Sequence, residues 1–162
     1  MIDDARVVVR DFMQVHFGQK EDIDQWMKLV TKVSDNFPGL ETEEALEEHK
    51  KTVLKFIGKE QALCVKEGDK IVGVLLFSRG HNMICCLAVD TDYRREGFGS
   101  LLLDAAIDEL DRTKDITVTT FREGDAKGTA PRALYKKFGF VEGELVEEFG
   151  YPNQVFILPS KA

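Results

Sequence analysis

The sequence has little cysteine and no spacing typical of a cross-linked or metal-binding protein. Its three cysteines are Cys64 and the adjacent pair Cys85 and Cys86. An odd count without a Cys-x-x-Cys spacing argues against a disulfide framework. The three histidines lie far apart: His16, His49 and His81. We therefore expect no metal. Cys85 or Cys86 could be a nucleophile, although buried strand cysteines are far more often small core residues.

The chain also lacks a long apolar run and an excess of positive charge. No stretch approaches the ~20 apolar residues that a membrane-spanning helix needs, and the first residues contain no signal-peptide core. The formal net charge of −7 argues against a nucleic-acid partner and weakly favours cationic ligands such as amines. These features predict a cytoplasmic protein without a nucleic-acid or membrane partner. Its oligomeric state stays open, with a homodimer as one alternative.

The 162 residues, 43% of them hydrophobic, predict one domain spanning residues 1–162. Its most informative stretch begins with the apolar run Met83–Val89, which predicts a strand buried on both faces. Apolar spacing over 102–110 then predicts a helix. Two arginines and two glycines lie between them. Free N–H groups at a helix start, reached through a glycine loop, make an anion site, although the loop could also be a plain tight turn.

The loop does not match two common phosphate-binding patterns. The chain has no Walker sequence, and Gly97-x-Gly99 is followed by Leu102 where a dinucleotide fingerprint needs a third glycine. Instead, Arg94-x-x-Gly97-x-Gly99 after a strand resembles motif A of the GCN5-related N-acetyltransferase (GNAT) superfamily. In that family the loop wraps the pyrophosphate of acetyl coenzyme A. Glu96 departs from the family, where many members are basic or neutral.

A second run, Leu134–Phe140, resembles the family's motif B, in which a helix with Leu-Tyr-x-x-x-Gly-Phe leads into a strand. By itself it could be an ordinary helix with a glycine C-cap. The two motifs occur in the family's order with a strand between them. The asparagine that often precedes the motif B helix is Gly128 here, and a usual alanine is Pro131.

The remaining patterns predict a set of helices and strands. Val7–Arg10 predicts a first strand, and two helices are expected over about 20–33 and, with Thr42 as N-cap, up to Gly58. A short helix is expected near 130–137. Other strands are expected at 61–66, 71–77, 83–89, 116–121, about 140–147 and 154–158. The order predicts an antiparallel meander and then a parallel crossover.

The fold class is therefore α+β, with helices on both faces of a mixed, mostly antiparallel sheet. The resemblance adds that the two central parallel strands, 83–89 and 116–121, splay apart. Backbone groups at such a gap could pair with the amide-rich pantetheine arm of the coenzyme. The resemblance implies that the main chain of Leu87, Ala88 and Val89 binds this arm. It also implies a set of residues that hold the pyrophosphate: Arg94, Arg95, Gly97, Phe98, Gly99 and Ser100.

The implied reaction is acetyl transfer from acetyl coenzyme A to a primary amine of a small molecule or peptide, by direct attack in a ternary complex. Tyr135 aligns with the family's general acid, with a core tyrosine as the alternative. An amine with a pKa near 10 is about one part in 10³ free at pH 7, so a base or water chain must take a proton. Asp90 follows the first of the two strands, and Glu123 and Asp125 follow the second, but acids in such places are far more often solvated loop residues than catalytic bases.

The acceptor is not readable from the sequence. The resemblance points to residues after the first strand and in the last strands: Trp26, Phe37, Pro38, Leu40, Phe149, Tyr151 and Pro152. Most of these could equally be core residues. An acidic strip could attract a cationic amine or be an exposed strand face: Glu142, Glu144, Glu147 and Glu148. Two alternatives remain, namely a non-catalytic acyl coenzyme A sensor module and an acyltransferase with another donor, such as succinyl or propionyl coenzyme A.

Overall fold

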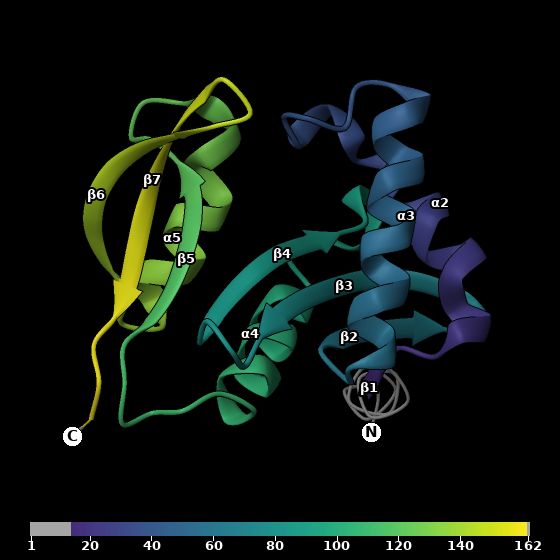
Figure 1. Ribbon diagram of the computed structural model, residues 1–162, viewed down its shortest axis with the longest axis horizontal. Helices are drawn as coiled ribbons and strands as arrows, with labels where there is room; N and C mark the ends of the chain where they lie inside the picture. The colour runs from purple at the N-terminus through teal and green to yellow at the C-terminus, as the bar shows by residue number, and fades with distance from the viewer. Residues whose placement is uncertain (1–13, 162) are drawn as a thin grey trace, which may run out of the picture.

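The computed structural model describes residues 14–161, so the strand expected at Val7–Arg10 lies outside the described residues. Over 14–161 the strands form a seven-stranded sheet with the order β1-β2-β3-β4-β5-β7-β6 (Figure 1). The strands are β1 (Val15–Phe17), β2 (Ala62–Glu67), β3 (Lys70–Ser78), β4 (Met83–Val89), β5 (Ile116–Phe121), β6 (Val141–Glu148) and β7 (Tyr151–Leu158). The longer helices are α2 (Ile23–Lys32), α3 (Glu43–Gly58), α4 (Phe98–Asp108) and α5 (Thr129–Lys137).

Four short 3₁₀ turns complete the described elements: η1 (Lys20–Asp22), η2 (Ser34–Asn36), η3 (Thr91–Tyr93) and η4 (Ala126–Gly128). The two predicted helices in the first third of the chain are confirmed. Thr42 caps α3 as expected, since its side-chain oxygen accepts the N–H of Ala45 at 3.0 Å. None of the described helices is long and apolar enough to cross a membrane.

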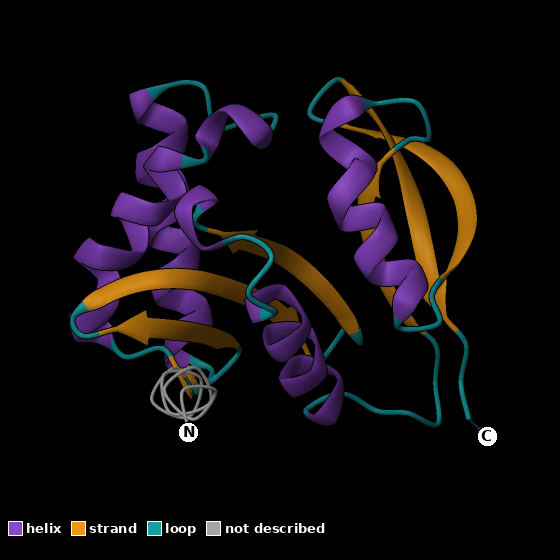
Figure 2. Cartoon of the chain, turned by 180° about the vertical axis from the view of Figure 1, so that it is seen from behind, coloured by secondary structure: helices purple, strands orange, loops and turns teal. Residues whose placement is uncertain are grey.

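The helices cover both faces of the sheet, and the two faces have separate apolar cores. Trp26 of α2 and Val53 of α3 pack with Cys64, Ile71 and other residues on one face. Leu102 and Leu103 of α4, with Tyr135 of α5, pack on the opposite face. Figure 2 shows α4 and α5 together on the side turned away from the viewer in Figure 1.

The predicted strand order is largely confirmed. β2, β3 and β4 form an antiparallel meander, and β4 and β5 are parallel. The strand β1 was missed: its three residues, paired with β2, are too few for a periodic pattern. β7 begins at Tyr151, earlier than expected. The class is α+β with helices on both faces, as predicted.

The central parallel strands pair only at their beginnings. Met83 is opposite Thr117 and Ile84 is opposite Val118, and the described residues contain no further β4–β5 pair. At this point Cys85 is an extra residue in β4, because Ile84 faces Phe77 of β3 while Cys86 faces Leu76. A bulge of this kind bends a strand and increases its twist. The bulge at Cys85 therefore accounts for the predicted divergence of β4 from β5.

Candidate functional site

The loop after β4 presents a row of free backbone donors. Arg95 and Gly97 have positive φ angles of 67° and 84°, and α4 begins directly afterwards at Phe98. Leu101 N–H makes the first bond of this helix, to Gly97 at 3.0 Å. Within residues 14–161, no N–H from Arg94 to Ser100 donates to a protein acceptor. Successive free amides at a helix N-terminus form a concave anion site.

The side chains of the loop leave these amides accessible. Arg94, Arg95 and Glu96 are exposed, whereas Phe98 is buried in the core and anchors the start of α4. A Cβ at Gly99 would lie 3.3 Å from Leu134 of α5 and 3.9 Å from Val89 of β4. The two motif segments therefore meet at Gly99. The accessible loop, its free backbone N–H donors and the exposed Arg94 and Arg95 all suit the binding of a pyrophosphate.

The register of β4 shows which of its backbone groups face the gap. Asp90 N–H donates to Val72 of β3 at 2.8 Å, and hydrogen-bonded pairs alternate along an antiparallel ladder. The pair Ala88–Val74 is then also hydrogen bonded. Leu87 and Val89 consequently turn their N–H and C=O groups away from β3, toward the gap beside β5.

Tyr135 lies on α5, facing the sheet, and its side chain is 4% exposed. Its ring packs against Phe140 and Phe156, with centroid distances of 5.6 and 6.2 Å. Its hydroxyl has no hydrogen-bond partner among the described residues. Burial, with the nearby Cys86 thiol, raises the pKa of Tyr135 well above its usual value. The phenol therefore keeps its proton at neutral pH and retains a free donor near β4.

The start of α5 explains the departure at Gly128. A Cβ there would lie 2.8 Å from the Cβ of Phe121 and 3.2 Å from Cδ of Arg132. Any side chain at this position would require a shift of α5 or of the end of β5. The asparagine that the motif B resemblance implies at this position is thus sterically excluded.

Asp90 differs from the solvated acid that was expected, because its side chain is only 1% exposed. Its carboxylate lies 2.7 Å from Lys32 Nζ and 3.6 Å from Lys70 Nζ, and it accepts Asp92 N–H at 2.9 Å. Burial alone would raise the pKa of Asp90, but the Lys32 ammonium and the Asp92 amide hold it below its usual value. Asp90 thus joins α2 and β3 to the loop and is not free to act as a base.

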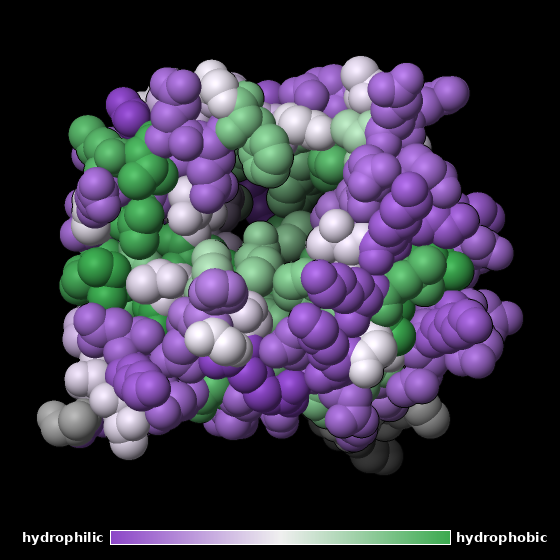
Figure 3. All heavy atoms as spheres, viewed as in Figure 1, coloured by the Kyte–Doolittle hydropathy of each residue, from purple (hydrophilic) through white to green (hydrophobic). Residues whose placement is uncertain are grey.

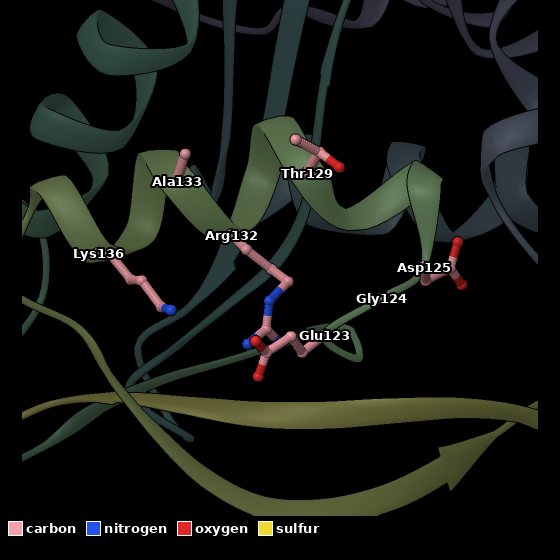
Figure 4. A pocket seen from close by; sticks show the side chains of 7 residues that line it. All are labelled: Glu123, Gly124, Asp125, Thr129, Arg132, Ala133 and Lys136. Carbon is pink, nitrogen blue, oxygen red and sulfur yellow. The ribbon is translucent and has the colours of Figure 1, made fainter.

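Glu123 and Asp125 lie in the loop that leads from β5 to the start of α5. Both line a cavity of about 270 Å³ with Arg132 and Lys136, shown in Figure 4. Asp125 accepts the hydroxyl of Tyr151 at 2.6 Å; this bond and the Lys127 amide keep the pKa of Asp125 low despite desolvation. In Figure 4 Asp125 points away from Arg132, whereas Glu123 lies beside it.

The residues considered for acceptor binding differ in how far they are buried. Trp26 is fully buried in the core and does not line a surface. Phe37, Pro38 and Leu40 are half-buried, and Pro152 is exposed. In the acidic strip, Glu142 forms an ion pair with Arg132, which ties β6 to α5. Among the described residues, no three His, Cys, Asp or Glu side chains group as metal ligands.

Two residues that position segments around the site were not predicted from the sequence. Lys32 reaches Asp90 and Asp92, both at 2.7 Å. Asn82 donates to the carbonyls of Asp111 and Asp115 and accepts the Asp111 N–H, each at 2.9 Å. These bonds hold the segment between α4 and β5 against the start of β4. No pattern in the sequence signals either role, because the partners are distant along the chain.

The sequence model of the acetyltransferase (GNAT) domain matches residues 58–142. Over 67 residues the chain is 39% identical to the [ribosomal protein bS18]-alanine N-acetyltransferase of Escherichia coli K12. This match covers 41% of the chain and 43% of the relative, so the chain spans less than half the length of the curated relative.

Solved structures match over nearly the whole fold. An N-acetyltransferase from Staphylococcus aureus Mu50 has a TM-score of 0.71 at 17% identity, covering 89% of this chain and 99% of that one. The PaiA N-acetyltransferase from Thermoplasma acidophilum, solved with coenzyme A, has a TM-score of 0.68 at 15% identity, covering 91% and 98%. At such identities the likeness establishes the fold.

Proposed function

This chain belongs to the acetyltransferase (GNAT) family, and from this premise we propose that it is an acetyl coenzyme A-dependent N-acetyltransferase. Its acceptor would be a primary amine of a small molecule or peptide, attacking directly in a ternary complex. One observation carries the proposal: the free amides of Arg94–Ser100 lie at the end of β4, where β4 has separated from β5. A phosphate site beside an open strand edge suits a diphosphate with an amide-rich arm.

We assign the loop to the pyrophosphate. The N–H groups of Gly97, Phe98, Gly99 and Ser100 would donate to its oxygens, and the exposed Arg94 and Arg95 would add charge. Arginine pairs with phosphate through charge-assisted bonds. The bare Gly97 leaves open space around its Cα, so nothing crowds an approaching ligand.

The pantetheine arm would run along the free edge of β4. Leu87 and Val89 turn their backbone groups to this edge, while Ala88 lies between them and bonds toward β3. Acetyl coenzyme A, when bound, supplies a thioester whose carbonyl carbon accepts the amine nitrogen. An N–H of Leu87 or Val89 would donate to the carbonyl oxygen and stabilise the charge that develops there.

Tyr135 is the proposed general acid. Its pKa is raised by burial, and its hydroxyl, free of protein partners among the described residues, could donate a proton to the departing thiolate. With Asp90 ion-paired and Asp125 bonded to Tyr151, we assign proton removal from the amine to water in the gap.

The E. coli relative is named for acetylating an alanine of a ribosomal protein, which supports a peptide amine as one acceptor class. The acidic composition supports a cationic acceptor and no nucleic-acid partner. We further propose one catalytic domain over residues 1–162, in the cytoplasm. A homodimer and a monomer are both compatible with this function.

The test is thiol release on mixing the protein with acetyl coenzyme A and a panel of amines and short peptides. We expect turnover that depends on both substrates. Tight coenzyme A binding in calorimetry without turnover on any amine would favour the sensor alternative. Absence of coenzyme A binding would refute the site itself.

A further inference from the structure

The loop assigned to the pyrophosphate has an aromatic residue at each end. Tyr93 directly precedes the loop residues 94–97, and Phe98 directly follows them. The centroids of the two rings are 6.4 Å apart, so the ends of the loop meet. Phe98 is buried, and the half-buried Tyr93 packs against the same core cluster. The Tyr93 N–H also donates to the Asp90 carbonyl at 2.9 Å. The conformation of the loop therefore depends on where Tyr93 is held.

The hairpin between β2 and β3 holds Tyr93 through two side chains. The Tyr93 hydroxyl donates to the carboxylate of Glu67, the last residue of β2. The ammonium of Lys70, the first residue of β3, lies 5.2 Å from the centroid of the Tyr93 ring and 3.6 Å from the Asp90 carboxylate. A hydrogen bond to a carboxylate and a cation over an aromatic face are both favourable. The bond to Glu67 also raises the pKa of Tyr93 to about 12, so the phenol remains a donor at neutral pH.

These contacts lie on the side of β4 that is away from the gap. In the sheet order, β2 and β3 are on one side of β4, and β5 is on the other. Figure 3, in the same view as Figure 1, shows the gap as a hollow between the ends of β4 and β5. Glu67 and Lys70 thus affect a ligand in the gap through Tyr93 and the loop.

We propose that Tyr93 is a positioning residue: held by Glu67 and Lys70, it fixes the loop so that the free N–H groups of residues 97–100 face the diphosphate before it arrives. A loop that is already ordered loses less conformational entropy when it binds a ligand. This inference rests on the proposed function for the identity of the ligand, but the hold on the loop is independent of catalysis.

The charge of Glu67 gives the proposal a distinctive sign. A carboxylate near the loop repels a bound diphosphate. If charge alone mattered, the removal of Glu67 would strengthen coenzyme A binding. If Glu67 acts by holding Tyr93, its removal weakens binding instead, because the loop must then be ordered when the ligand binds.

The first test measures coenzyme A affinity by calorimetry at pH 7. Tyr93→Phe removes only the hydroxyl, and Glu67→Ala removes its acceptor. Each should weaken binding about fivefold, the size of one typical net hydrogen bond, and the double variant should weaken it no further. Glu67→Gln keeps an acceptor oxygen and should restore most of the affinity. Asp69 is exposed in the same turn, so Asp69→Asn is the matched charge control and should not weaken binding.

The second test needs no ligand. Arg94 and Arg95 are exposed trypsin sites in the loop, and cleavage there requires local opening of the backbone. Without coenzyme, trypsin should cut at these sites severalfold faster in Tyr93→Phe and Glu67→Ala than in the wild type or Asp69→Asn. Mass spectrometry identifies the sites. Cleavage elsewhere in the chain is the reference, because general unfolding would accelerate all sites together.

Turnover separates positioning from chemistry. The KM for acetyl coenzyme A should rise in Tyr93→Phe while kcat is retained, since the loop binds the diphosphate and not the reacting thioester. Unchanged affinity in Tyr93→Phe, or tighter binding in Glu67→Ala, would overturn the positioning role. Faster loop cleavage in both variants, combined with no coenzyme A binding by the wild type, would support the hold of Tyr93 on the loop and refute the proposed function.

Discussion

Replacing Asp90 with asparagine removes the charge that links α2 and β3 to the phosphate loop. The asparagine oxygen can still accept the N–H of Asp92, now 2.9 Å from Asp90. It cannot neutralise Lys32, whose ammonium lies 2.7 Å away. The variant therefore removes the ion pair with Lys32 while keeping the hydrogen bond of the local turn.

The magnitude follows from burial. Breaking a fully buried pair costs about 3–5 kcal/mol. Here only Asp90 is buried at 1% exposure, while Lys32 is 38% exposed and can return to water. A smaller loss of about 1–3 kcal/mol in the free energy of unfolding is expected. Because the loop begins at Asp90, coenzyme A affinity should also fall about fivefold, equivalent to ~1 kcal/mol.

Urea denaturation at pH 7 gives the stability change, and calorimetry gives the coenzyme A affinity. A double-mutant cycle with Lys32→Met separates the pair from other effects. The folded-state pKa of Asp90 lies below its ordinary value, so its contribution is present above about pH 4 and is lost as the pH falls through the folded-state pKa. The wild type should therefore lose more stability than the variant in acid. A zero coupling energy with unchanged coenzyme A binding would refute the reasoning.

Three further results are expected at the site itself. Tyr135→Phe should lower kcat about 10²-fold or more without weakening coenzyme A binding, as for a lost general acid, and equal kinetics would remove the residue from that role. Gly97→Val should reduce coenzyme A affinity more than tenfold in calorimetry, because a β-branched residue resists the φ of 84°; unchanged affinity would contradict the loop assignment. Arg94→Ala and Arg95→Ala should each weaken coenzyme A binding severalfold and reduce its salt dependence, whereas an unaltered salt dependence would exclude a phosphate contact.

The local patterns of the sequence were sufficient for most of the fold. The apolar run of β4 and the cap at Thr42 depend on neighbours within a few residues. Such signals can be recognised in the sequence alone, because strand and helix periodicity and turn chemistry are local. The order of motifs in turn indicated the family, and the matching family model supports that conclusion.

The tertiary structure alone decided which side chains are available to the site. Asp90 looks like a loop acid in the sequence, yet Lys32 and Lys70 enclose it. Trp26 is buried in the core. Phe149 has a φ of 54°, which an aromatic residue disfavours, and its ring lies against Gly39. Burial and ion pairing depend on residues that are distant along the chain, and only the folded arrangement brings them together.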